Sequence, residues 1–170
     1  DAKNLKLVFL SGTPMKNVPF EIGKIFNILR GIICTHHFEV NSKKGKKLDL
    51  KDIELKLKML NNVDQVVIKS KDKIVKVTQN PLGFINSSDG RGLVKGDNNM
   101  TDMEFKSNLS DKLSEMGVDM KNYKLQKTTL FPNTDKEFMS MFYDNKSNDI
   151  LDQNLFKRRI MGMVSYYSSA

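Results

Sequence analysis

A short polar turn near the start of the chain carries the residues best suited to chemistry. An apolar run at residues 7–10 is followed by four turn residues and an asparagine, which are Ser11, Gly12, Thr13, Pro14 and Asn17. Small residues let a backbone bend sharply beside a ligand, and the two hydroxyls can hydrogen-bond groups that sense a phosphate. Ligands of open α/β sheets bind where core strands end, so the turn is a candidate nucleotide sensor. The alternative is a simple strand-to-helix turn with a Ser or Thr cap.

The residues that would hold the nucleotide itself are missing from the sequence. A phosphate loop needs G-x-x-x-x-G-K-[ST], and Mg²⁺ needs an acidic partner. The nearest match, residues 23–25, lacks the first glycine and the hydroxyl and falls inside a predicted helix. Residues 89–92 form a turn sequence and not an arginine finger. We therefore predict that this chain alone does not hydrolyse ATP.

Basic residues exceed acidic ones, 28 to 20, which gives a net charge of +8. The densest run is a predicted loop that contains Lys43, Lys44, Lys46 and Lys47. A second basic cluster, residues 157–159, lies on the last predicted helix. Clustered cations attract phosphate backbones, although each cluster is equally compatible with a solvated surface. The lysine loop is a candidate nucleic-acid contact.

The sequence offers little for metal or disulfide chemistry. Cys34 is the single cysteine, so it has no partner within the chain. His36 and His37 are neighbours, and neighbouring residues of a strand point to opposite faces. We expect no metal site and a reducing intracellular compartment. No apolar run reaches the length of a membrane span.

Periodicity predicts a mixed α+β chain. The predicted elements are a strand at 6–10, a helix at 19–30, a strand at 35–40, a helix at 50–61, strands at 63–68 and 73–78, a long loop at 80–99 with a short ribbon, a capped helix from 101 to 116, a strand at 123–131, and two C-terminal helices capped at Thr134 and Asp152. Alternating apolar residues at 53–59 leave a strand as the alternative for 50–61. From 35 to 131 the order is strand, helix, strand, strand, helix, strand, which is typical of a ferredoxin-like (split βαβ) domain.

Three segments resemble one protein family. The turn LSGTPMKN at 10–17 resembles motif III of superfamily 2 helicases and translocases, especially their remodeller-like branch. The phrases NPLGFIN (80–86) and LFPNTDKEFMSMF (130–142) are similar to the inserted region of ATP-dependent helicases of large nucleocytoplasmic DNA viruses, including their early transcription factors. Residues 154–170 resemble the segment that precedes the second motor lobe of those proteins.

The resemblance implies a piece of a larger motor. Residues 1–34 would be the end of the first RecA-like lobe, 35–133 an inserted α+β domain, and 134–170 a helical segment leading to the second lobe. Ser11, Gly12, Thr13, Pro14 and Asn17 would couple ATP hydrolysis to strand movement. Arg158 or Arg159 would brace the lobes or contact phosphate, because arginine binds phosphate in a bidentate manner.

The same resemblance implies ATP and Mg²⁺ as cofactors of the whole protein. Its partners would be DNA or RNA, the remaining motor lobes and possible viral transcription factors or RNA polymerase, with no membrane. The expected location is the virion or the viral factory in the host cytoplasm. Two rivals stay open: a module that docks a transcription partner, and an unrelated self-contained α+β domain. The second rival predicts that strand 6–10 lies centrally in the main sheet.

Overall fold

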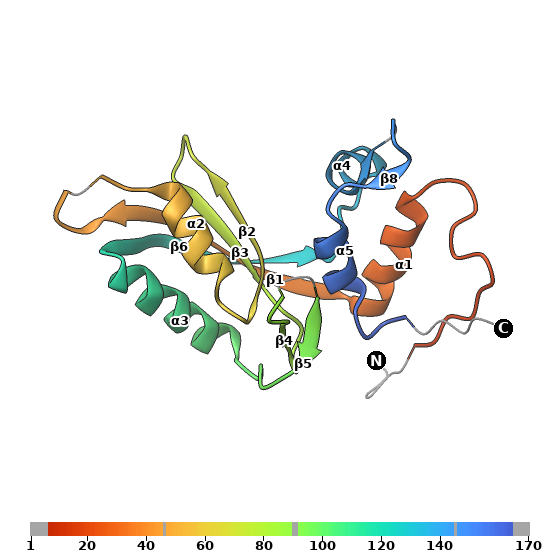
Figure 1. The fold of residues 1–170 in the computed structure, drawn as a ribbon, viewed down its shortest axis with the longest axis horizontal. Helices are drawn as coiled ribbons and strands as arrows, with labels where there is room; N and C mark the ends of the chain where they lie inside the picture. Colours follow the sequence, from red (N-terminus) through yellow and green to blue (C-terminus); the bar gives the residue numbers. More distant parts are fainter. Residues whose placement is uncertain (1–6, 46, 90–91, 145, 165–170) are drawn as a thin grey trace.

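The computed structural model describes residues 7–45, 47–89, 92–144 and 146–164, with only the backbone of Lys44. These residues form a mixed α+β fold with a four-stranded antiparallel sheet and five α-helices. Figure 1 shows the sheet with helices α2 (Leu50–Lys58) and α3 (Asp102–Glu115) in one part of the molecule. Helices α1 (Phe20–Arg30), α4 (Asp135–Phe142) and α5 (Gln153–Ile160) gather in the other part.

The sheet has the strand order β2-β3-β1-β6. Its strands are β1 (Ile32–Ser42), β2 (Val63–Lys69), β3 (Ile74–Gln79) and β6 (Val118–Thr129), and every neighbouring pair is antiparallel. All four were predicted, but β1 and β6 are longer than expected because they pair with each other along almost their whole length, from Ile32 opposite Thr129 to Ser42 opposite Val118. Polar residues at the ends of β1 and β6 can stay in strand conformation because the paired strand satisfies their backbone hydrogen bonds.

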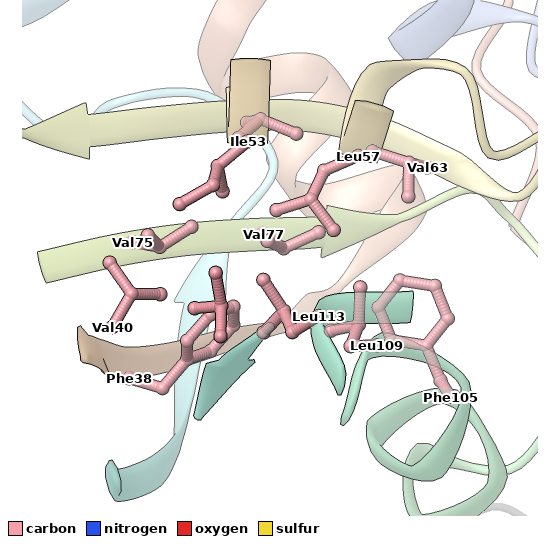
Figure 2. Packing of buried hydrophobic residues seen from close by; sticks show 12 residues of the cluster. Phe38, Val40, Ile53, Leu57, Val63, Val75, Val77, Phe105, Leu109 and Leu113 are labelled. Atoms are coloured by element: carbon pink, nitrogen blue, oxygen red, sulfur yellow. The ribbon is translucent and has the colours of Figure 1, made fainter. Parts of the chain in front are cut away.

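Helices α2 and α3 cover one face of the sheet and enclose the first hydrophobic core. Phe38, Val40, Val75 and Val77 point from the central strands toward Ile53 and Leu57 of α2 and Phe105, Leu109 and Leu113 of α3 (Figure 2). Ile53 and Leu57 are fully buried at helical spacing, so the strand alternative for this segment is excluded.

Local caps fix where these two helices begin. The Asp49 carboxylate accepts hydrogen bonds from the Lys51 and Asp52 amides, and Thr101 with Glu104 forms a complete capping box. Each cap satisfies amides that have no partner inside the helix. Gly117, with φ of +72°, ends the turn after α3 and lets the chain enter β6. The predicted capping chemistry is confirmed at both helices.

The predicted loop at 80–99 contains a two-stranded ribbon, β4 (Phe84–Asn86) with β5 (Leu93–Lys95). Asn98 holds it in place from inside, because its buried Nδ2 donates to the carbonyls of Asn80, Pro81 and Phe84. Asn86 similarly donates to the carbonyls of Leu60 and Val63. The ribbon is not part of the main sheet, and side-chain amides hold it in place by hydrogen-bonding to backbone carbonyls.

The second core consists of aromatic contacts among α1, α4, α5 and the chain that follows β6. Phe131 is its centre, with ring centroids of Phe138, Phe142 and Phe156 at 5.8, 5.1 and 5.2 Å. A short hairpin that the sequence did not predict, β7 (Tyr143–Asp144) with β8 (Asp149–Ile150), links α4 to α5. Helix α5 ends at Ile160, earlier than predicted, and residues 165–170 lie outside the described part of the chain.

The prediction of a strand at 6–10 is wrong for its described residues, 7–10, which have no regular structure. Their side chains are exposed to solvent: 47% for Leu7, 78% for Val8, 52% for Phe9 and 93% for Leu10. The run has the composition of a strand, but a strand needs a neighbour to pair with. No described strand offers that pairing here.

The three predicted segments do not remain separate. The predicted flanks, 1–34 and 134–170, contribute α1, α4 and α5 to a single core, the second one. The predicted insert, 35–133, contains α2, α3 and the sheet except for the first residues of β1, and it also contributes Leu130 and Phe131 to the second core. Strand β1 follows α1 directly through Gly31, with φ of +74°, so the boundary between the two parts falls at that glycine.

Candidate nucleic-acid interface

The polar turn at 11–17 lies at the surface just before α1. The Thr13 amide donates to Ser11 Oγ at 3.1 Å. The Glu21 carboxylate accepts from the amides of Lys16 and Asn17 at 2.8 and 3.1 Å, and from Asn17 Nδ2 at 3.2 Å. The bond from the Lys16 amide, followed by that from Asn17, lowers the pKa of Glu21. Asn17 is thus fixed to the helix, while Ser11 and Thr13 stay exposed at the bend.

The importance of Glu21 was not predicted. The signal was present, because an acidic residue two positions after Pro19 falls in the first helical turn, where it can accept from free amides. Helix α1 is in turn anchored by Phe20 and Phe26 in the second core. The turn is therefore hydrogen-bonded to the helical part of the molecule through the Glu21 carboxylate.

The lysine loop is partly docked on the protein. Lys43 opens a short 3₁₀ turn, Lys43–Gly45, and its amide donates to the carbonyl of Gly117. Its Nζ donates to Ser114 Oγ at 3.0 Å and lies 3.4 Å from the Asp119 carboxylate. Lys47 is exposed. The side chain of Lys44 and the whole of Lys46 lie outside the described residues. Of the described lysine side chains in this loop, Lys47 is open to a ligand and Lys43 is partly occupied.

Arg159 is not the exposed phosphate contact that the resemblance implied. Its side chain is 7% exposed, and its Nε donates to Asp64 Oδ2 at 3.2 Å. Its two terminal nitrogens donate to the carbonyl of Leu130 and, at 2.8 Å, to Gln65 Oε1. Because the guanidinium is enclosed by these acceptors, the prediction that Arg159 binds nucleic acid is corrected: it joins α5 to strand β2.

Arg158 and Arg30, both half-buried, lie near the same buried carboxylate, Asp64. Arg158 donates to the backbone carbonyl of Asp64 at 2.8 Å, and its Nε lies 3.8 Å from the Asp64 carboxylate, with 17% of the side chain exposed. Burial lowers the pKa of Arg30, and the charge of Asp64 opposes that effect. Burial also raises the pKa of Asp64, against the charges of Arg159, Arg158 and Arg30. Arg158 therefore contributes to the junction between the two cores, and its predicted phosphate contact stays a prediction because part of the side chain is exposed.

The sheet face opposite α2 and α3 carries cations that the sequence analysis did not single out. Strand register places Lys76 of β3 opposite His37 of β1, and His37 opposite Lys124 of β6, so the three form one row across the sheet. Val67 of β2 extends the row beyond Lys76. We call these three residues, Lys76, His37 and Lys124, the cationic row.

A polar row lies beside the cationic row on the same face. Gln65 pairs with Thr78, Thr78 with Thr35, and Thr35 with Gln126. On each strand the member of the polar row lies two residues from the strand's residue in the cationic row. The side chains of the two rows therefore point to the same face, and the rows are about 7 Å apart. The hydroxyls of Thr35 and Thr128 lie 3.0 Å apart and extend this polar surface toward the second core.

A groove of about 850 Å³ lies over the polar row and over Lys76 and His37 of the cationic row, with Lys124 outside its lining. Its floor includes His37, Lys76 and Gln126, and its wall is built by residues 129–133 and by Met141 of α4. The hollow therefore lies where the open sheet face meets the helical part of the molecule. Burial, followed by the charges of Lys76 and Lys69, lowers the pKa of His37, because added positive charge is unfavourable in this field.

The two histidines face opposite sides of the sheet, as strand alternation predicted. His36 is fully buried, its Nδ1 lies 2.9 Å from the Tyr123 hydroxyl, and its ring packs on Phe105. Burial lowers the pKa of His36, opposed by Asp102 and reinforced by His37. Within the described ranges, no group of three or more His, Cys, Asp or Glu side chains could hold a metal ion.

No helix in the described part of the chain is long and apolar enough to cross a bilayer. Comparison of the chain with protein-family models, with curated proteins and with solved structures found no match.

Proposed function

We propose that this chain is a segment of a superfamily 2 nucleic-acid motor, in which the turn at 11–17 couples ATP hydrolysis to strand movement. The observation that carries the proposal is the apolar run at 7–10, which is exposed, unpaired among the described strands, and followed at once by the polar turn. Four consecutive large apolar side chains in water indicate a missing partner surface. The partner that fits is the parallel sheet of a motor lobe, in which strands are buried on both faces and read as continuous apolar runs.

The position of the run also separates the proposal from a rival. A self-contained α+β domain with a chance SGTP sequence would use residues 6–10 as a central strand of the main sheet. The central strands of that sheet are β3 and β1, and residues 7–10 lie outside it. This arrangement supports a segment that completes its fold against another part of a longer polypeptide.

The contacts of the turn suggest how coupling would work. A shift of Ser11 or Thr13 toward a bound triphosphate would move the bend, and Glu21 connects that bend to α1 through Lys16 and Asn17. Helix α1 packs with α4 and α5 in one core. Movement at the nucleotide would thus be passed to the segment expected to lead to the second lobe.

The sheet unit would be a ferredoxin-like insert. Support comes from the strand order β2-β3-β1-β6 with all pairs antiparallel, and from two helices that share one face. In the whole protein ATP and Mg²⁺ would be held by other segments, and the polymer would be DNA or RNA. Viral transcription, with its polymerase and factors in the cytoplasmic factory or virion, is the process that the resemblance suggests.

The experiment uses the longer polypeptide that the proposal requires. Thr13→Ala in that protein should leave ATP binding intact and reduce nucleic-acid-stimulated ATP turnover, because the hydroxyl acts at the coupling step. Ser70→Ala, in the turn between β2 and β3, is the matched control and should have no effect. Unchanged stimulated turnover in Thr13→Ala, or a native protein of only 19.5 kDa, would overturn the proposal.

A further inference from the structure

We propose that the open face of the sheet is a binding site for single-stranded nucleic acid, with phosphates on Lys76 and Lys124 of the cationic row, a base on His37 between them and base edges on the neighbouring polar row. The inference deepens the proposed function, on which it rests for the class of ligand, and places the contact at residues other than the lysine loop and the arginines of α5. It is carried by the strand register and the groove above it.

The spacing of the two rows suits a polymer. Neighbouring strands lie about 4.8 Å apart, so the backbones of Lys76 and Lys124, two strands apart, are separated by about 10 Å with His37 between them. The polar row lies about 7 Å farther along the strands. A chain laid across the strands can therefore keep its phosphates on one row while its bases reach the other.

The charges of this face favour an anion. Lys69 adds a third lysine at the end of β2, on the same side as Val67. Two carboxylates lie near this face: Glu39 accepts from Asn122 Nδ2 at 2.9 Å, and Glu137, in the groove wall, accepts from Thr134 Oγ1 at 2.8 Å. These donors are neutral and do not offset the two carboxylates, but the three lysines outnumber them. The row thus keeps a positive field that phosphates can neutralise with release of counterions.

The polar row favours unpaired bases over an acidic protein. Exposed Gln126 carries donors and an acceptor, Gln65 keeps its amide donors while its Oε1 accepts from Arg159, and the Thr35 hydroxyl can both donate and accept, so together they match the mixed edges of bases. Thr78, which is 5% exposed, lies beneath them. The carboxylates of an acidic peptide would present acceptors alone. The wall at residues 129–133 stands beside the floor, so bases reach the polar row only when they are not paired in a duplex.

His37 has a further use at the centre of the row. Burial and the neighbouring lysines hold its pKa below the ordinary value, which favours the neutral ring near pH 7. A neutral imidazole can stack on an unpaired base. In the described part of this face it lies between two lysines that would hold the flanking phosphates.

The test measures binding of fluorescein-labelled dT and U oligomers of about 20 nucleotides by anisotropy, between about 50 and about 200 mM KCl. Lys76→Gln/Lys124→Gln should weaken binding about tenfold at the low salt and reduce the slope of log K against log salt by about 1.4, since each single-strand phosphate contact contributes about 0.7. The pair lies outside the buried cores, so the urea midpoint should be unchanged.

Matched variants isolate the site. Lys51→Gln/Lys112→Gln removes the same charge from α2 and α3, on the covered side of the sheet, and should bind like the parent protein. Substituting the lysines of the 43–47 loop by Gln measures that loop separately. A 20-base-pair duplex and poly-glutamate, at equal charge, serve as competitors and should displace the oligomer poorly.

The site would be overturned if Lys76→Gln/Lys124→Gln and Lys51→Gln/Lys112→Gln weakened oligomer binding equally, or if only the variant of the 43–47 loop weakened it. Displacement by duplex or poly-glutamate would overturn the ligand class. Failure of the parent protein to bind any oligomer would remove the nucleic-acid contact from both proposals. The ATP-coupling effect of Thr13→Ala is measured separately, so the motor proposal can survive the loss of this site, and the site can survive the loss of the motor proposal.

Discussion

Arg159→Met should destabilise the fold and leave nucleic-acid binding unchanged. The substitution keeps an unbranched side chain but removes the guanidinium that reaches Asp64, Gln65 and the Leu130 carbonyl. The Asp64 side chain is 8% exposed and would keep only Arg158, whose Nε is 3.8 Å away, as a close ion-pair partner. Removing one member of a buried ion pair costs about 3–5 kcal/mol, because the remaining charge stays buried.

That loss is a large share of the stability of a domain, which is about 5–15 kcal/mol. It should lower the melting temperature by about 6–20 °C for a chain of this size. Urea unfolding followed by far-UV circular dichroism measures the free energy directly, and the midpoint should fall with little change in slope. Lys157→Met is the control, because Lys157 lies two residues before Arg159 on the exposed side of α5. Its free energy of unfolding should stay within about 0.5 kcal/mol of the parent value.

The opposite result would refute the reasoning. If Arg159→Met were as stable as Lys157→Met but bound single strands several-fold more weakly, the arginine would be a phosphate contact and not a link between the two cores. The double variant Asp64→Leu/Arg159→Met adds a second check, because removal of both charges should recover much of the lost stability. If the stability losses of the two single variants simply added in the double variant, Asp64 and Arg159 would not stabilise the fold as a pair.

Three other changes test the fold and its pH dependence. Burial lowers the pKa of His36, so below about pH 6.5 the unfolded chain binds more protons than the folded one and the folded state loses stability. The urea midpoint of the parent protein should therefore fall between about pH 7.5 and about pH 5, and His36→Gln should make that decline smaller. A parent midpoint that does not change with pH would contradict this. Gly23→Ala would place a Cβ 2.7 Å from Phe138 and should cost about 1–3 kcal/mol by calorimetry, whereas Gly12→Ala meets nothing within 4 Å and should be neutral for folding. Thr101→Ala should cost about 1 kcal/mol in urea unfolding, and an unchanged midpoint would mean that the capping box contributes nothing.

The helices and their ends follow from local sequence. The cap at Asp49 and the capping box of Thr101 with Glu104 act over three residues, so their chemistry is visible in the chain itself. The strands β2 and β3 follow from alternation and a short turn. Apolar spacing also predicted the helices and strands that build the two cores, because a helix buries one stripe and a strand one face wherever it packs.

At two places residue type alone predicted the wrong environment for a segment or side chain. The run at 7–10 has strand composition, yet composition does not supply a pairing partner, and the described sheet has no place for it. Arg159 looks like a surface cation beside Lys157, but its helix packs on β2, 95 residues earlier, where Asp64 meets it. Whether a charge is solvated or buried depends on the neighbour across the fold, and sequence spacing along one helix does not reveal that neighbour.

The chain by itself determined where the helices and the four strands of the main sheet form, to within a few residues, and that its net charge is positive, because propensity, capping and periodicity act between residues a few positions apart. Only the tertiary structure decided that Lys76, His37 and Lys124 stand in one row, since strand register joins positions about 40 and 90 residues apart. Pairing across a sheet is a long-range choice that depends on all four strands together.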